Sequence, residues 1–391
     1  MGDQVSETPI EPLATAERHP SIDRFERLIR SSQYDDALAV LSSLPEDALT
    51  SEWCVLCAEM YFELFHFTLA GEFARRATKL APTDPRALFI HSLMWPAERN
   101  AAVSLMKMLA PSCAFTLAAT AINSAREDAV SMARTAYRQA PDQFHVASRL
   151  VHALFHWKQY NEGLEVIAAC KRRWPESAWL DVSAATMLDE LGQHRDAERL
   201  VKAVLDRLPD YRFALHQYGF YLLANARGRR LPASDPKLAL TLALDCLTRA
   251  RPDGFFDRLD VDIAECLGGL GRWGEALALL DEVRSRGSSD WKRFGTILYG
   301  SILLENDRSP AAASRWLREI LPDALEEAFY DPRTHTLSAT ALKRIGNDQL
   351  AEKSAAHAAA LTAGRELSAH DIAMFFEHIG DMLPQNPNGF R

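Results

Sequence analysis

The chain has 391 residues, too many for one simple hydrophobic core, so several domains or one elongated array are expected. Its 44 basic and 53 acidic residues give a net charge of -9, which disfavours nucleic acid as the main partner, because duplex-binding proteins usually carry a broad basic face. No secretory signal or membrane span is visible, and six scattered cysteines do not resemble a disulfide framework, so the expected location is the cytoplasm.

In chain order, residues 1 to 20 are expected to form a disordered lead, residues 21 to 383 a helical array, and residues 384 to 391 a short tail. The array is suggested by three prolines, Pro141, Pro175 and Pro209, which lie 34 residues apart. Twelve residues before each proline stands a tiny side chain, and apolar residues follow it at three- and four-residue spacings. This pattern predicts repeated helix hairpins, since a tiny residue lets two helices approach closely and a proline ends the second one.

A second mark recurs where the second helix of each hairpin is expected to begin. A ring side chain is followed by an acid and then a tiny residue, and glycine precedes two of the copies, at Gly192 and Gly271. The copies are Tyr34-Asp35-Asp36-Ala37, Tyr160-Asn161-Glu162-Gly163, His194-Arg195-Asp196-Ala197 and Trp273-Gly274-Glu275-Ala276. The 34-residue period, the turn glycine, this step and the closing proline resemble the tetratricopeptide repeat family. The resemblance implies an all-α, right-handed superhelical solenoid of antiparallel helix hairpins.

The repeats are uneven along the chain. The clearest lie at about 51–84 and 110–211, while Trp95-Pro96 and Ala110-Pro111 break the intervening segment into shorter helices. An insertion at about 226–235 is expected to separate the two helices of one hairpin, and the repeats of 290–383 are degenerate. Three basic residues of the insertion, Arg227, Arg229 and Arg230, are either a solvated loop or a contact for an acidic partner.

Two local patterns suggest chemistry but are better explained by structure. Cys54 and Cys57 form a C-x-x-C pair without further zinc ligands at matching spacing, so core packing is the favoured interpretation and no metal or cofactor is expected. Paired acids occur at Glu59 and Glu63, and at Asp262 and Glu265. Helices commonly carry such pairs as solvated surface, so they predict no catalytic site.

The most distinctive constellation is His145, Arg149, His152 and His156, whose spacings place all four on one stripe of a first helix. The family resemblance implies that first helices line a concave groove, where extended peptides or partner termini bind. Asp189, Glu190, His216 and Gln217 would neighbour this stripe. A polar face wetted by solvent explains the same pattern. If the stripe binds an acidic partner, its histidines should titrate near neutral pH and strengthen binding as pH falls.

The sequence therefore predicts a scaffold, adaptor or chaperone-like module, not an enzyme, that holds a segment of another protein, possibly an acidic one, in a concave groove. Two alternatives stay open: an enzyme or accessory subunit that binds a small anion or a metal through the histidine stripe, and a self-associating structural component. Partner identity and oligomeric state are not predicted.

Overall fold

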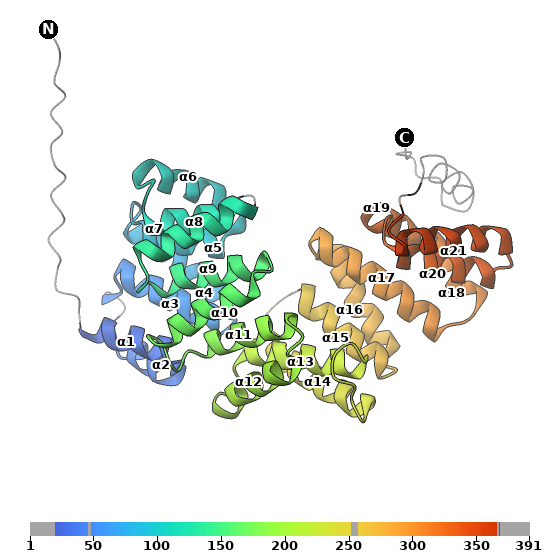
Figure 1. The fold of residues 1–391 in the computed structure, drawn as a ribbon, viewed down its shortest axis with the longest axis horizontal. Helices are drawn as coiled ribbons and strands as arrows, with labels where there is room; N and C mark the ends of the chain where they lie inside the picture. The colour runs from blue at the N-terminus through green and yellow to red at the C-terminus, as the bar shows by residue number, and fades with distance from the viewer. Residues whose placement is uncertain are drawn as a thin grey trace, which may run out of the picture. The chain divides into compact units, whose positions relative to one another are not determined.

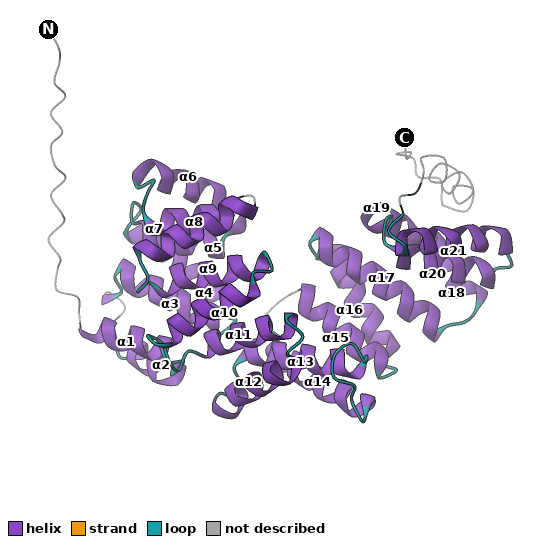
Figure 2. Ribbon diagram, in the orientation of Figure 1, coloured by secondary structure: helices purple, strands orange, loops and turns teal. Residues whose placement is uncertain are grey.

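The computed structural model describes residues 20–45, 48–122, 124, 126–251, 257–365 and 367. Within this part of the chain the secondary structure is helical throughout, without a strand (Figure 1; Figure 2). The predicted tail 384–391 and nearly all of the predicted lead lie outside these residues, and Pro20 begins the first helix. Among the described helices, none has the length and apolar character needed to cross a bilayer.

The chain divides into two compact units, residues 1–204 and residues 205–391. Unit 1 is built from six successive helix pairs: α1 (Pro20–Arg30) with α2 (Tyr34–Ser42), α3 (Ser51–Glu63) with α4 (Phe67–Leu80), α5 (Pro85–Met94) with α6 (Arg99–Leu109), α7 (Ala114–Ala121) with α8 (Arg126–Gln139), α9 (Phe144–His156) with α10 (Tyr160–Lys171), and α11 (Ala178–Glu190) with α12 (His194–Arg207). A 3-10 turn, Pro96–Glu98, joins α5 to α6 where the sequence predicts a break. The boundary between the units falls within α12.

Unit 2 continues the pattern less regularly. Its helices are α13 (Arg212–Ala226), α14 (Pro236–Ala250), α15 (Asp257–Gly269), α16 (Trp273–Arg286), α17 (Ser289–Asn306), α18 (Pro310–Arg315), α19 (Leu321–Ala328), α20 (Pro332–Arg344) and α21 (Asp348–Thr362). A π-helical turn, Trp316–Ile320, joins α18 to α19, which interrupts the simple hairpin repeat. The predicted insertion lies between α13 and α14.

The tiny residues of the sequence pattern lie where the paired helices pack most closely. Ala37, Ala129, Ala197 and Ala276 are all buried. A side chain added at Gly163 would place its Cβ 2.5 Å from the sulfur of Met187, so α10 and α11 approach too closely for a larger residue. The 34-residue pattern therefore reports the contacts within and between neighbouring hairpins, as predicted.

The turns between paired helices share one backbone geometry. In six hairpins the residue two positions before the second helix has a positive φ: Ser32, Phe65, Lys158, Gly192, Gly271 and Gly346. Glycine adopts this left-handed conformation without steric cost, whereas residues with a Cβ are strained there. The turn glycines found in the sequence thus have a physical reason, and three hairpins keep the same turn without glycine.

Several helices begin at a short polar residue followed by proline. The side chain of Asp84 caps α5, and those of Asp235, Ser309 and Asp331 cap α14, α18 and α20, each accepting a backbone N–H of the first turn. Proline occupies the next position, where its missing N–H costs nothing. These local signals define helix starts where the longer repeat is degenerate.

Candidate functional site

A buried carboxylate, Glu59 of α3, lies at the centre of an ion cluster inside unit 1. Its Oε2 accepts a hydrogen bond from Arg30 Nη2 of α1 at 2.5 Å, and its Oε1 lies 3.4 Å from Arg86 Nη2 of α5. His145 of α9 also contacts Oε1 through Nε2. Glu59 is 1% exposed, so three partners from three helices replace the water that it loses.

Glu63, one turn further along α3, extends the cluster. Its Oε1 lies 3.7 Å from Arg30 Nη1, and its Oε2 accepts a hydrogen bond of 2.6 Å from the hydroxyl of Tyr34. The sequence-based interpretation of Glu59 and Glu63 as solvated surface is therefore wrong. Both point inward because the first helices of successive hairpins face one another within unit 1, which brings α1, α5 and α9 onto the same side of α3.

The two carboxylates differ in charge behaviour. Burial opposes ionisation of Glu59, but its interactions with His145, Arg30 and Arg86 outweigh burial and hold the pKa of Glu59 well below its usual range. For Glu63 burial is the largest influence, and it raises the pKa to about 7 although Arg30 and Tyr34 act against it. Two carboxyl groups one helical turn apart thus differ in protonation because of the number of cations that each one contacts.

The end of α1 is held against elements that lie far away in the sequence. Arg30 Nη2 is 3.4 Å from His145 Nε2, and its guanidinium lies 4.5 Å from the ring centre of Phe144 at the start of α9. The hydroxyl of Ser32 accepts a hydrogen bond of 3.0 Å from the backbone N–H of Ala178, the first residue of α11. Helix α1 therefore closes over the starts of α9 and α11 within unit 1.

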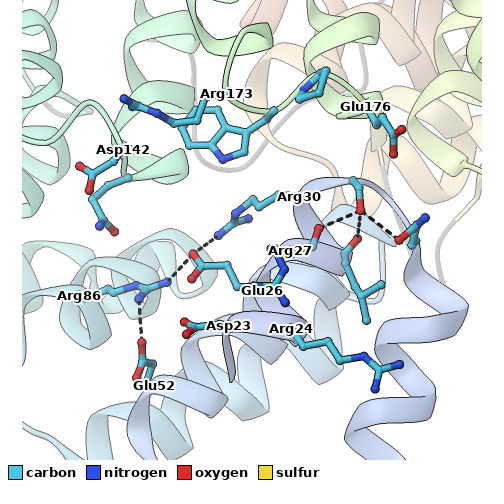
Figure 3. A pocket seen from close by; sticks show the side chains of 16 residues that line it. Asp23, Arg24, Glu26, Arg27, Arg30, Glu52, Arg86, Asp142, Arg173 and Glu176 are labelled. Carbon is cyan, nitrogen blue, oxygen red and sulfur yellow. Dashed lines mark hydrogen bonds and ion pairs between the residues drawn. The ribbon is translucent and has the colours of Figure 1, made fainter. Parts of the chain in front are cut away.

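A cavity of about 790 Å³ opens between α1 and the segments that precede α9 and α11 (Figure 3). In the figure, Asp142 and Arg173 lie across the cavity from Asp23, Arg24 and Arg27 of α1. The lining holds five arginines and five carboxylates: Arg24, Arg27, Arg30, Arg86 and Arg173, with Asp23, Glu26, Glu52, Asp142 and Glu176.

Some of these charges form part of the wall, whereas others are exposed, and of the exposed ones Arg173 also donates a hydrogen bond from Nη1 to the carbonyl of Pro141. Glu26 Oε1 lies 3.6 Å from Arg30 Nη2 and 3.8 Å from Arg86 Nη2, so this part of the floor is neutralised within the protein. Arg24, Arg27, Arg173, Asp142 and Glu176 are exposed. A second hollow of about 560 Å³ shares Glu52, Arg86, Asp142 and Gln143 with the first and reaches the start of α7, so the two form a continuous polar cleft. We call it the α1 cleft.

The sequence did not point to the residues of the α1 cleft. Most come from α1 and from connections between hairpins, which the repeat pattern describes only as spacers, while Glu52 lies on α3 and Arg86 on α5. One signal was present: α1 is dense in alternating charge, with Asp23, Arg24, Glu26, Arg27 and Arg30 beside a narrow apolar stripe. A short helix with so many charges at its start and end is a candidate for a polar contact surface.

The predicted histidine stripe lies on α9, but its four residues have different environments. His145 belongs to the ion cluster around Glu59, and Arg149 is half-buried. His152 and His156 are exposed, with nearly parallel rings whose centres lie 6.5 Å apart. The stripe is therefore a buried structural contact at one end and an open surface at the other.

For two of these histidines the pKa is shifted downward from its usual value. Burial lowers the pKa of His145, although Glu59 acts in the opposite direction. The charge of Arg149, followed by burial and by His156, lowers the pKa of His152 to about 3. A guanidinium one turn away disfavours a second positive charge even on a ring that water reaches.

The acidic residues expected beside the stripe have partners in their own or the preceding hairpin. Asp189 Oδ1 lies 2.7 Å from His194 Nδ1 at the start of α12, and Glu190 Oε2 accepts a hydrogen bond of 3.1 Å from the Tyr160 hydroxyl. His216 and Gln217 belong to α13 of unit 2 and are both buried. His216 Nε2 lies 3.7 Å from Asp262 Oδ2.

The arginines of the insertion contact their own unit. Arg227 Nε and Arg229 Nη2 lie 3.2 Å and 2.9 Å from Glu265 Oε1 of α15, and the guanidinium of Arg230 lies 3.8 Å from the ring centre of Tyr221. Glu265 therefore serves as an anchor for the insertion and offsets one of its three positive charges within unit 2.

Cys54 and Cys57 are fully buried on α3, as the core-packing interpretation predicts. Burial raises the pKa of both thiols. Within the described part of the chain, no group of three or more His, Cys, Asp or Glu side chains has the arrangement of a metal site.

Comparison with known proteins identifies the fold. No protein-family model matches the chain, and no curated protein sequence matches it. Among solved structures, the human IFIT1 dimer with m7Gppp-AAAA is similar at 16% identity and a TM-score of 0.50, covering 88% of this chain and 90% of that one. The chain has a tetratricopeptide-like helical-repeat fold.

Two further structures resemble the chain more weakly. The human IFIT1 dimer with PPP-AAAA has 14% identity and a TM-score of 0.47, covering 88% of this chain and 95% of that one. The APC/C hetero-tetramer Cut9-Hcn1 has 14% identity and a TM-score of 0.37, covering 91% and 82%. At such identities the similarity describes the fold and leaves the ligand open.

Proposed function

We propose that this protein is a binding scaffold that holds an extended polar segment of a partner protein in the α1 cleft. The observation that carries the proposal is the cleft of about 790 Å³, in which five arginines and five carboxylates line one continuous hollow. Binding rather than catalysis is the role that we propose, with no cofactor.

The balance of charge in the cleft favours a polypeptide as ligand. A phosphodiester backbone presents only negative charge and would meet Asp23, Asp142 and Glu176 as well as the arginines. A polypeptide segment that carries both signs can pair with Arg27 and Arg173 on one hand and with Asp142 and Glu176 on the other. The helical-repeat fold occurs in human IFIT1 with m7Gppp-AAAA, so the charges of the cleft, not the fold, support a protein ligand. The expected partner is therefore of mixed charge, not simply acidic.

The shape of the cleft supports the same proposal. Its lining comes from α1, from the starts of α3 and α5, and from the segments before α9 and α11, so one ligand would contact several hairpins at once. Trp174 and Pro175 add an apolar surface among the charges. A ligand that runs along the shared hollow would therefore find ion pairs at intervals and one apolar contact.

We extend the proposal to a reducing compartment, the cytoplasm. All six cysteines are free, and Cys54 and Cys57, although neighbours on one helix, do not form a disulfide. The alternative of a self-associating structural component stays a prediction, which the dependence of molecular mass on protein concentration tests.

Site-specific photo-crosslinking in the native cell tests the proposal. A photoreactive side chain at Arg27, inside the cleft, is expected to crosslink a defined partner, whereas the same group at the exposed Arg199 of α12 is not. The charge reversals Arg27→Glu and Arg173→Glu together should lower recovery of that partner at least tenfold, because two ion pairs become repulsions.

Arg199→Glu is the matched control, since Arg199 is equally charged and outside the cleft. Equal recovery of the partner by the double variant and by the control would show that the cleft does not bind it.

A further inference from the structure

One arginine of unit 2 contacts aromatic rings from two neighbouring helices. The guanidinium carbon of Arg258, at the start of α15, lies 5.8 Å from the ring centre of Phe220 on α13 and 5.9 Å from that of Trp291 on α17. Phe294 follows Trp291 on α17, and the centres of these two rings are 5.6 Å apart. Arg258 is exposed and the three rings are half-buried, so these contacts lie at the surface of the unit.

Two more arginines extend this series of contacts at Phe294. The guanidinium carbons of Arg293, its neighbour in α17, and of Arg333, at the start of α20, lie 5.0 Å and 5.5 Å from the centre of the Phe294 ring. All these distances fall within the range of about 6 Å over which an aromatic face attracts a guanidinium. We call the six side chains the arginine–aromatic strip: Phe220, Arg258, Trp291, Arg293, Phe294 and Arg333.

The strip carries a net positive charge. Asp331 pairs with Arg333, with 2.7 Å between Oδ2 and Nη2. Burial opposes ionisation of Asp331, but Arg333, followed by the charge of Arg293, holds its pKa below the usual value. In the part of the chain that the structure describes, no carboxylate forms an ion pair with Arg258 or Arg293. Glu265, which also acts on Arg333, is held by arginines of the insertion.

Helix stability does not explain why these cations are placed here. Arg258 and Arg333 are each the second residue of their helix, where the helix dipole disfavours positive charge. The rings restrain the guanidiniums, so less conformational freedom is lost when a ligand pairs with them. The strip is therefore a preorganised set of cations on the surface of unit 2.

The strip offers N–H donors more than open ring faces. Each of its rings is half-buried and already has a guanidinium over it. Single-stranded nucleic acid binds largely by stacking its bases on open aromatic faces, which are covered here. The outer edge of an exposed guanidinium, by contrast, donates two parallel N–H bonds to a carboxylate. The chemistry of the strip therefore favours carboxylates as the ligand groups.

We propose that the arginine–aromatic strip binds an acidic segment of another protein, whose Asp or Glu side chains pair with Arg258 and Arg293. Complementary charge draws such a segment to the strip, and the stacked guanidiniums present their donors to it. The strip belongs to unit 2 and shares no residue with the lining of the α1 cleft, so this proposal does not depend on the proposed function.

Fluorine NMR of the full chain labelled with 5-fluorotryptophan tests the proposal. The resonance that disappears in Trp291→Phe reports on the strip. The probe is a short synthetic peptide of alternating glutamate and serine with blocked ends. Its addition should shift the Trp291 resonance to saturation, whereas the same peptide with glutamine in place of glutamate should not, because it carries no charge.

A double variant removes the two guanidiniums that form no ion pair. Arg258→Gln with Arg293→Gln should weaken binding of the acidic peptide by at least about fivefold. The matched control, Arg249→Gln with Arg286→Gln, removes the same charge from exposed residues of unit 2 outside the strip and should bind as the wild type does. Arg258→Lys should bind with intermediate affinity, because an ammonium lacks the paired donors. Unchanged resonances of the other tryptophans verify that each variant is folded.

Other results would overturn the proposal. These are a Trp291 resonance that does not move, equal affinity of the double variant and its control, and tighter binding of oligothymidylate than of the acidic peptide. A lower molecular mass of the double variant than of the control would assign the strip to a second copy of the chain instead. The α1 cleft variant, Arg27→Glu with Arg173→Glu, should leave the Trp291 titration unchanged, and loss of the shift there would assign the peptide to the cleft.

Discussion

The two units fill the space between their first helices in different ways. In unit 1, α3 and α9 meet through Glu59, His145 and Arg30, a buried set of charges. In unit 2, one hydrophobic cluster extends from Leu215 of α13 to Ala351 of α21, and the polar contact between His216 and Asp262 is long, at 3.7 Å. Among the described residues of unit 1, the apolar clusters are smaller and separate.

This difference indicates two ways to stabilise stacked hairpins. Apolar contact is non-directional and tolerates small displacements. Its contribution to the stability of unit 2 therefore depends on how much apolar surface is buried, not on the exact position of each side chain. Buried ions are satisfied only when every partner is in place, so the cluster in unit 1 ties the end of α1 to one position on α3 and α9. The placement of α1 matters because it forms one wall of the α1 cleft.

The largest expected effect comes from removing the central charge of unit 1. Glu59→Gln should lower the free energy of unfolding by about 3–5 kcal/mol, because Arg30 and Arg86 then keep a buried charge without a counter-ion. The corresponding change in unit 2, Asp262→Asn, should cost about 1 kcal/mol, since its contact with His216 is long. Urea unfolding, with hydrogen exchange to locate the change, compares the two. Equal losses would contradict the difference between the units.

Enlarging a buried alanine or glycine at a close helix contact should be destabilising in both units. Ala197→Leu overpacks a fully buried site in α12 and should cost about 1–3 kcal/mol. Gly300→Ala should cost a similar amount, because its Cβ would lie 2.2 Å from the ring of Trp316. The surface change Arg195→Lys is the control and should stay within about 0.5 kcal/mol. Melting temperatures equal to that of the control would refute the assigned helix contacts.

Titration should act in opposite directions at one buried group of each unit. The pKa of Glu63 is raised from 4.5 to about 7, so its contribution to stability is complete below pH 4.5 and is lost as pH rises through 7. Glu63→Gln should therefore become more stable relative to the wild type by roughly 2–3 kcal/mol between pH 4.5 and pH 8. A constant difference across this range would show that Glu63 ionises normally.

In unit 2, burial lowers the pKa of His335 from 6.5 to about 4. Its contribution is present above pH 6.5 and is lost as pH falls through 4. The difference in free energy of unfolding between the wild type and His335→Asn should therefore shrink as pH falls over this window. Urea unfolding at several pH values measures this difference. A difference that grows on acidification would contradict the assignment.

The smallest effects should come from the hairpin turns. Lys158→Gly in unit 1 should raise stability by about 0.5–1 kcal/mol, because a lysine with φ of 58° is strained and glycine is not. Gly271→Ala in unit 2, at φ of 77°, should lower it by about 1–2 kcal/mol. Thermal unfolding measures both changes, and the same sign for both would exclude the shared turn geometry.

Within one hairpin and between consecutive hairpins, the sequence alone was a reliable guide. The contacts of Ala129, Gly163 and Ala197, and the turns at Gly192 and Gly271, join residues a few helical turns apart, and such contacts repeat with the 34-residue period. Helix propensity, tiny residues and proline act locally, so periodicity in the chain becomes periodicity in the structure. The buried positions of Cys54 and Cys57 follow from the same register.

Only the tertiary structure decided which polar residues face inward and meet. Arg30 and Glu59 are separated by 29 positions in the sequence, and Arg30 and His145 by 115. The 34-residue repeat does not predict contacts at these separations. Glu59, a surface residue by composition, became buried because successive hairpins bring α1, α5 and α9 around α3. Charge pairing depends on partners in space. The amphipathic pattern thus determined the hairpins, while their stacking determined the cleft and the ion cluster.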